Sequence, residues 1–202
     1  MPRRLRLQFE GTIYHVMSRG NARQDIVQED HDRHQFLELL AAQVARTRWE
    51  IIYFVLMTNH FHLLVRTPLP NLAAGMQWLL SAYAKAMAVR HRRPGHLFQG
   101  RYKAELIEDE SYYWTVSRYI HLNPVRVGLV ARPEEWSWSS YPGYADPTCR
   151  VSWIAYDRLW QAWRGEFRGK TTDAIDDYRR FVTSGVEQPP ESPFAVMRHG
   201  WI

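Results

Sequence analysis

The chain contains very little cysteine and very little lysine, and both scarcities restrict what it can be. Among its 202 residues Cys149 is the single cysteine, so no internal disulfide can form, and we expect a reducing, cytoplasmic environment. Only Lys85, Lys103 and Lys170 stand among the 26 basic residues, so arginine supplies most of the positive charge behind a net charge of +5. Because arginine binds phosphates and guanine edges in a bidentate manner, this composition favours an acidic partner such as nucleic acid.

Long apolar runs are missing as well, although 46% of the residues are hydrophobic. No stretch approaches the roughly 18–20 apolar residues that a membrane-spanning helix needs. Residues 1–11, MPRRLRLQFEG, lack the apolar core of a signal peptide. Internal repeats, low-complexity tracts and an ATP-binding motif are also absent. The sequence therefore predicts a folded protein that depends on neither a membrane nor ATP.

The hydrophobic pattern predicts a defined order of strands and helices. That order is strand, helix, two strands, helix, strand and helix, over residues 11–19, 30–47, 49–57, 60–67, 69–93, 102–108 and 109–122. Pro124 is expected to end the last helix near Asn123. A β-α-β-β-α-β order predicts an α+β, ferredoxin-like (RRM-like) fold, with an antiparallel sheet and both crossover helices on one face. The other face is then open for a ligand or for the additional helix.

The pattern of apolar and polar residues changes after residue 145. Residues 151–167 and 171–186 carry amphipathic helical patterns, and residues 187–194 are rich in proline. We therefore expect a main domain over residues 1–145 and a small helical extension over residues 146–202.

Two pairs of polar residues suggest a chemical site. In a strand, His60 and His62 project from one face while Phe61 is buried behind them, and two neighbouring imidazoles form half of a metal site. Tyr119 and Asn123 lie four residues apart, so a helix presents both on one face. A histidine pair alone is more often structural than metal-binding. The spacing does not say whether the helix faces the histidines.

Five separated segments resemble the Y1 tyrosine transposases of the IS200-like superfamily, which are HUH single-stranded DNA endonucleases, and in particular the REP-associated tyrosine transposases. The second segment is similar to the histidine-hydrophobe-histidine motif of that superfamily, and the fourth to its catalytic-tyrosine helix. Thr58 stands where proline is common in the family. In chain order the segments are YHVMSRGN (14–21), MTNHFHLLV (57–65), GHLFQGRYKA (95–104), RYIHLNPVRVGLV (118–130) and WSWSSYPGY (136–144).

The resemblance implies a site and a reaction. His60, His62 and Asn123 would hold a divalent metal, Mg²⁺ or Mn²⁺, and Tyr119 would be the nucleophile, on a helix that covers the open face of the sheet. The implied reaction is DNA transposition or recombination chemistry, in which single-stranded DNA is cleaved beside palindromic REP-type hairpins through a covalent 5′-phosphotyrosine link and then rejoined. The alternative is a catalytically silent regulator that binds DNA or RNA hairpins with the same fold. Both a monomer and a homodimer are compatible with the sequence.

Basic and amide side chains near the sheet are candidates for contacts with DNA phosphates or bases. For each of them a solvated surface side chain is an equally good interpretation. An RNA-binding module would instead use exposed aromatic side chains such as Tyr53 and Phe61, but the neighbouring histidines favour a metal. His121 lies off the Tyr119 face and is expected to be structural. The candidate DNA-binding residues are Arg3, Arg4, Arg6, Arg19, Asn21, Arg101 and Lys103.

Overall fold

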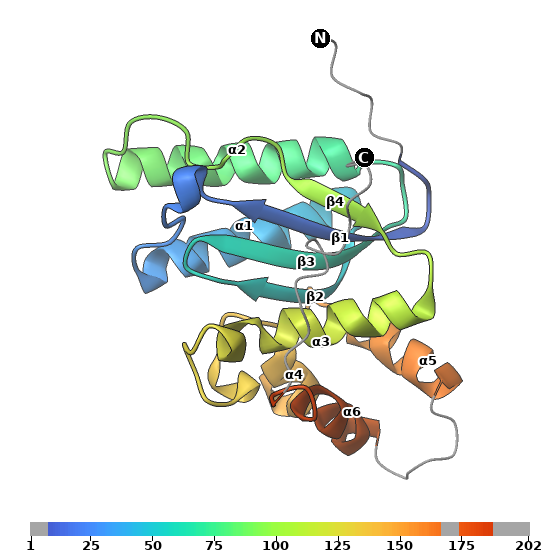
Figure 1. Ribbon diagram of the computed structural model, residues 1–202. Helices are drawn as coiled ribbons and strands as arrows, with labels where there is room; N and C mark the ends of the chain where they lie inside the picture. Colours follow the sequence, from blue (N-terminus) through green and yellow to red (C-terminus); the bar gives the residue numbers. More distant parts are fainter. Residues whose placement is uncertain (1–7, 167–173, 188–202) are drawn as a thin grey trace.

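The computed structural model describes residues 8–166 and 174–187, and its centre is a four-stranded antiparallel sheet in the order β2-β3-β1-β4. Two helices, α1 and α2, cover one face of the sheet, and α3 crosses the other (Figure 1). This arrangement confirms the predicted α+β fold class. The elements are β1 (Thr12–Arg19), α1 (Asp30–Thr47), β2 (Glu50–Leu56), β3 (His60–Thr67), α2 (Leu72–Arg90), β4 (Lys103–Leu106) and α3 (Glu110–Arg126).

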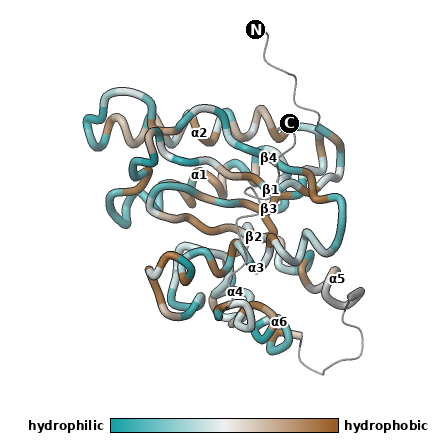
Figure 2. Tube along the Cα trace, viewed as in Figure 1, coloured by the Kyte–Doolittle hydropathy of each residue, from teal (hydrophilic) through white to brown (hydrophobic). Residues whose placement is uncertain are grey.

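The two faces of β3 have different partners, as its alternating side chains require. Phe61 is fully buried on the face toward α1 and α2, where its ring centroid lies 4.9 Å from that of Phe36. Phe36 in turn packs edge-on against Tyr83 of α2. Figure 2 shows that β2 is largely apolar, whereas the other strands mix apolar and polar residues. The main core therefore fills the layer behind the sheet, and His60 and His62 face the opposite layer.

The structure corrects the predicted end of α3. The helix does not stop near Asn123 but continues through Pro124 to Arg126. Proline costs a helix one N–H donor and disfavours the helical conformation of the preceding residue. Asn123 is nevertheless only 3% exposed, so its packing against the sheet outweighs that local preference. Because α3 is one turn longer than predicted, Arg126 belongs to the same helix as Tyr119.

Three further helices follow, α4 (Tyr141–Ala145), α5 (Tyr156–Glu166) and α6 (Ala174–Thr183). Figure 1 places α4 and α6 beside α3, on its side away from the sheet. Their connection to α3 is polar and buried, because the Tyr178 hydroxyl lies 2.9 Å from Ser117 Oγ and 2.8 Å from His121 Nδ1. The other ring nitrogen of His121 lies 2.9 Å from Ser140 Oγ. His121 is thus a structural residue of this junction.

Short 3-10 turns complete the described chain, at Asn21–Arg23, Pro133–Glu135 and Pro147–Cys149. The division into a domain of residues 1–145 and an extension of residues 146–202 stays a prediction, and parts of that extension lie outside the described residues. Within residues 8–166 and 174–187, no helix combines the length and the apolar character needed to cross a membrane.

Candidate active site

Helix α3 brings Tyr119 directly onto the histidine pair of β3. The ring centroid of Tyr119 lies 5.2 Å from that of His62, with the two rings perpendicular. The His60 and His62 rings are 5.1 Å apart and also perpendicular. All three side chains are buried, with exposed fractions of 5% for Tyr119, 8% for His60 and 1% for His62. The structure therefore shows that the helix face with Tyr119 packs against the strand face with His60 and His62, which the sequence alone did not determine.

Asn123 completes this group one helical turn beyond Tyr119. Its side chain lies beside that of His60, and among the described residues its buried Nδ2 atom has no hydrogen-bond partner. A buried amide group that lacks a partner is costly unless a ligand or water satisfies it. His60, His62, Tyr119 and Asn123 thus form one cluster, and the chemical roles expected of them stay predictions.

The orientation of His60 is set by its neighbour Asn59. His60 Nδ1 lies 2.7 Å from Asn59 Oδ1, while Asn59 Nδ2 donates to the carbonyl oxygen of Arg23 at 3.2 Å. This second bond fixes which end of the Asn59 amide faces the histidine. Since a carbonyl oxygen only accepts hydrogen bonds, His60 Nδ1 carries the proton and Nε2 keeps the lone pair that a metal ligand needs.

His62 is held by a third histidine that sequence reasoning missed. His15 of β1 is fully buried, and its Nε2 lies 3.0 Å from His62 Nδ1. When His62 Nε2 acts as a ligand atom, Nδ1 carries the proton and donates it to His15. The strand register explains the contact, because His62 is opposite Met17 and His15 is its diagonal neighbour on the same face. His15 is visible in the sequence, but the strand register that places it beside His62 is not.

Burial keeps the three rings neutral. Desolvation lowers the pKa of His15 to about 3. It also lowers the pKa of His60 to about 4, and the positive charges of Arg19 and Arg126 act in the same direction while the neighbouring Asn123 side chain opposes them. The pKa of His62 is lowered well below its usual value, first by desolvation and then by neighbouring histidines and arginines. Neutral imidazole is the form that binds metals, so at neutral pH the histidine rings are in the protonation state that a metal ligand needs.

Arginine side chains surround this neutral cluster. The Arg126 guanidinium lies 5.1 Å from the centre of the Tyr119 ring, in a cation–π arrangement. Arg126 lies seven positions after Tyr119, about two helical turns, so both are on one helix face. This signal was present in the sequence, but the expected helix end at Pro124 concealed it. Arg19 is opposite His60 in the β1–β3 register, and it contributes with desolvation to lowering the pKa of Lys103.

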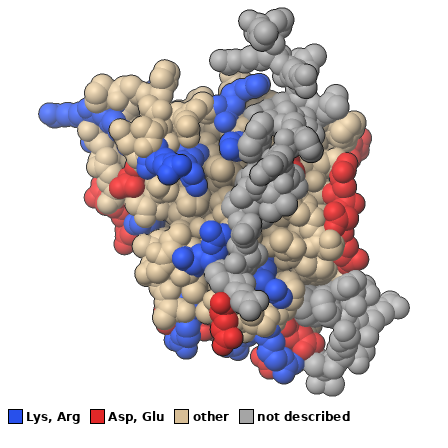
Figure 3. Space-filling view, in the orientation of Figure 1, with Lys and Arg blue, Asp and Glu red and all other residues tan. Residues whose placement is uncertain are grey.

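The structure separates the candidate DNA-binding residues into groups. Arg19 and Lys103 flank the histidine and tyrosine cluster, whereas Asn21 and Arg101 are exposed and line a neighbouring cavity. A band of Lys and Arg side chains runs down the middle of the face seen in Figure 3, and acidic side chains lie mainly at its rims. This arrangement suits a polyanion that crosses the α3 side of the sheet. Arg3, Arg4 and Arg6 lie outside the described residues.

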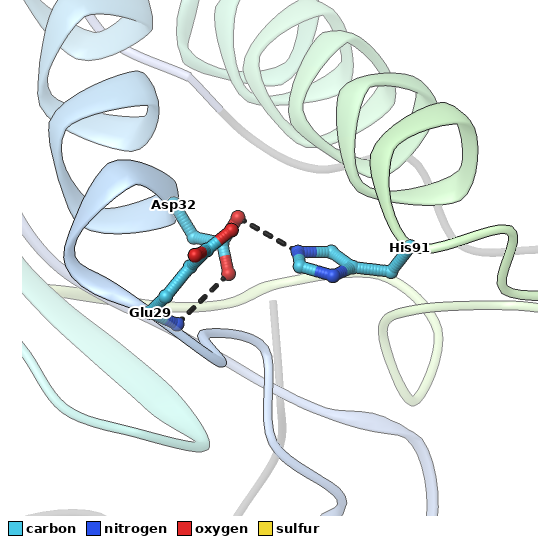
Figure 4. Close-up of side chains that lie close together, drawn as sticks. All are labelled: Glu29, Asp32 and His91. Carbon is cyan, nitrogen blue, oxygen red and sulfur yellow. Dashed lines mark hydrogen bonds and ion pairs between the residues drawn. The ribbon is translucent and has the colours of Figure 1, made fainter.

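A second group of potential metal ligands lies on the opposite, helical side. Glu29, Asp32 and His91 each offer a ligand atom, and these atoms lie within 4.8 Å of one another (Figure 4). Asp32 is fully buried; its Oδ2 accepts from the backbone N–H groups of Gln28 and Glu29, and its Oδ1 lies 2.8 Å from His91 Nε2.

A cation already occupies this second group, because Arg90 Nε lies 2.6 Å from Glu29 Oε1 and 3.6 Å from Asp32 Oδ1. Together with the hydrogen bonds to Asp32, these ion pairs tie the start of α1 to the end of α2. The group therefore fits a structural role better than metal binding.

Comparison with known proteins supplies an independent result. Residues 8–123 match the family model described as "Transposase IS200 like". A solved structure described as a REP-associated tyrosine transposase bound to a REP hairpin has 16% identity and a TM-score of 0.63, over 75% of this chain and 89% of that chain. At this identity the likeness shows the fold alone.

Two further solved structures are similar to this chain with lower TM-scores. A putative transposase from Deinococcus radiodurans R1 has 17% identity and a TM-score of 0.43, over 59% of this chain and 95% of that chain. The tRNA(His) guanylyltransferase from Saccharomyces cerevisiae has 10% identity and a TM-score of 0.44, over 96% and 89%. No curated protein matches the chain.

Proposed function

Since this chain belongs to the IS200-like transposase family, we propose that it cleaves single-stranded DNA beside palindromic hairpins and rejoins it, with Tyr119 as the nucleophile. The observation that carries this proposal is the contact between Tyr119 and His62, whose ring centroids lie 5.2 Å apart. The sheet face and α3 of one chain supply the whole cluster. This supports a site that a monomer can complete.

His60, His62 and Asn123 fit a divalent cation. Their side chains are neutral and close together, and Asn123 Nδ2 is buried and has no hydrogen-bond partner among the described residues. Asn59 and His15 contact the Nδ1 atoms of the two histidines, so a bound ion would be held through their Nε2 atoms. When bound, Mg²⁺ or Mn²⁺ would polarise the scissile phosphate and offset its developing negative charge. Imidazole ligands favour Mn²⁺ over Mg²⁺.

The reaction that we propose is an exchange of phosphodiester bonds. The Tyr119 hydroxyl oxygen attacks the phosphorus, a bond to the 5′-phosphate forms, and the bond to the departing 3′-oxygen breaks. The phenol proton passes to solvent, and the 3′-oxygen takes up a proton as it leaves. A DNA 3′-hydroxyl can later reverse these steps, since the phosphotyrosine link conserves the energy of the broken bond. The positive charge of Arg126 beside Tyr119 stabilises negative charge that develops at the phosphate.

A Tyr119→Phe variant tests this proposal. Wild-type protein, Mn²⁺ and a pool of DNA hairpins with randomised single-stranded flanks should give a covalent protein–DNA adduct on a denaturing gel. We expect Tyr119→Phe to form no adduct while it still binds the pool in fluorescence anisotropy. The matched control is Tyr112→Phe on the same helix, which loses a hydroxyl that donates to Glu105. Adduct formation by Tyr119→Phe would contradict the proposed nucleophile.

One observation favours the alternative of a catalytically silent regulator that binds hairpins. Tyr119 is only 5% exposed, so a phosphate must displace neighbouring side chains to reach its hydroxyl. The wild-type adduct assay separates the two functions. Binding of the pool without any adduct, with either Mg²⁺ or Mn²⁺, would favour the silent regulator.

A further inference from the structure

A cavity of about 880 Å³ opens between α2 and residues 95–102, the segment that leads into β4. Its floor is apolar and partly aromatic. Leu80, Leu97, Phe98 and Tyr102 form this floor and are each less than 10% exposed. The volume and the apolar, partly aromatic floor suit a planar heterocyclic ligand, because aromatic side chains can stack against any nucleobase.

The rim of this cavity carries polar side chains that the fold does not use. All of them are exposed, and none forms a hydrogen bond or ion pair through its side chain with a described residue. Elsewhere many exposed polar side chains are paired, as Arg132 is with Glu135. Among the described residues, no acidic side chain lines the cavity. The rim residues are Asn21, Gln77, Ser81, His96, Gln99 and Arg101.

This chemistry matches a base and its phosphate. Asparagine and glutamine side chains each present a donor and an acceptor side by side, the pattern that reads the edge of a nucleobase. Arg101 adds a cation for a phosphate oxygen. Because none of these residues is a carboxylate, the cavity favours an anionic ligand over a basic one.

The cavity is joined to the candidate active site through the end of β1. Asn21 N donates to the carbonyl oxygen of Leu97 at 2.9 Å, and Gln99 N donates to the carbonyl oxygen of Arg19 at 2.9 Å. Arg19 is itself opposite His60 across the β1–β3 ladder. A nucleic-acid strand with a phosphate at Tyr119 can therefore continue past the end of β1 and reach the cavity.

We propose that this cavity binds one or two bases of the single strand that flanks the cleaved phosphate, and that Gln77 and Gln99 determine which bases are accepted. This assignment rests on the proposed function, because it takes single-stranded DNA as the ligand. It adds a place on the protein where sequence preference arises. That place is separate from the residues that carry out the cleavage.

An affinity selection tests the assignment. The Tyr119→Phe protein, which forms no adduct under the proposed function, is incubated with a pool of DNA hairpins whose single-stranded flanks are randomised, and bound DNA is sequenced. The same selection is run with Gln77→Ala and Gln99→Ala added, singly and together. We expect the base preference to fall about tenfold at one or two adjacent flank positions, the discrimination that one amide–base contact provides. Ser81→Ala is a second, milder variant of the rim.

The control is Gln28→Ala, an exposed glutamine outside the cavity. An unchanged preference at every position, a uniform loss for all sequences, or no preference in the Tyr119→Phe protein itself would overturn the assignment. Equal retention of a matching RNA pool would also overturn it. The wild-type adduct assay on the same pool reports on the proposed function separately, since base preference without any adduct would contradict cleavage and leave the cavity assignment standing.

Discussion

The chain carries two clusters of potential metal ligands, and they differ in charge and in the partners that they already have. The sheet cluster consists of His60, His62 and Asn123, which are neutral, and no residue in the described part of the chain pairs with the buried Asn123 Nδ2. The helix cluster consists of Glu29, Asp32 and His91. Both oxygens of Asp32 accept hydrogen bonds there, and Arg90 pairs with both carboxylates.

This comparison shows that closeness of ligand atoms is a weak guide to a metal site. The ligand atoms of the helix cluster lie within 4.8 Å of one another, yet Arg90 and backbone N–H groups already pair with them. The decisive differences are the charge of the ligand atoms and whether a cation is paired directly with them. Both differences lead to predictions that separate the clusters.

The largest expected effect is on metal binding. His62→Ala removes a proposed ligand, so we expect Mn²⁺ binding, followed by electron paramagnetic resonance, and adduct formation both to be lost. His91→Ala, the matched change in the helix cluster, should leave both unchanged. Loss of Mn²⁺ binding in His91→Ala with retention in His62→Ala would reverse the assignment of the two clusters.

A smaller loss of metal affinity is expected from the residues behind the histidines. His15→Ala and Asn59→Ala remove the partners of His62 Nδ1 and His60 Nδ1. Loss of such a supporting hydrogen bond typically weakens metal binding by roughly 10- to 100-fold. Mn²⁺ titration of the two variants measures this directly. Wild-type affinity in both would show that these contacts do not orient the ligands.

The helix cluster should matter for stability instead. Asp32→Asn places an amide N–H beside backbone donors that the carboxylate now accepts from, at a fully buried position. We expect the free energy of unfolding, from urea denaturation, to fall by about 1–3 kcal/mol. Mn²⁺ affinity should stay at the wild-type value. A stable Asp32→Asn protein that loses Mn²⁺ would contradict the structural role.

On acidification, the protein should lose the stability contributed by the α3 side at a higher pH than the stability contributed by the helix cluster. Burial lowers the pKa of His121 to about 3, so the unfolded chain takes up a proton below about pH 6.5 while the folded chain does not. Stability that is present above that pH is therefore lost on acidification, by ~2 kcal/mol at about pH 5 for one such histidine.

The folded pKa of Asp32 is lowered in spite of desolvation, because His91 and two backbone N–H groups stabilise the carboxylate. Its contribution is present above the unfolded pKa and is lost only as the pH falls below about 4. Urea denaturation from pH 7 to pH 3 separates the two ranges. A stability that is constant between pH 7 and pH 5 would contradict the neutral burial of His121.

The sequence predicted the main residues of the candidate site, but it did not predict the contacts that hold these residues in place. Alternation placed His60 and His62 on one face, helical spacing joined Tyr119 to Asn123, and the element order predicted the sheet. Which layer α3 occupies followed from the family resemblance, because local spacing carries no information on docking. The contact of His15 with His62 depends on a strand register between residues 47 positions apart.

Two other features could not be predicted from the sequence: the true end of α3, and a junction between residues far apart along the chain. Pro124 suggested a helix end, and the tertiary packing of Asn123 overrides that preference. The junction of Tyr178 with Ser117 and His121 joins residues about sixty positions apart in a region that the pattern described only as an appendage. Such long-range contacts leave no periodic signal in the sequence.

The central claim is that Tyr119 attacks DNA at the sheet cluster, and peptide mapping of the covalent adduct tests it most directly. Wild-type protein is trapped on hairpin DNA with Mn²⁺, digested with protease and nuclease, and analysed by mass spectrometry to locate the phosphorylated residue. We expect a nucleotide fragment linked to Tyr119 and to none of the other ten tyrosines of the chain. A fragment linked to any other residue would contradict Tyr119 as the nucleophile.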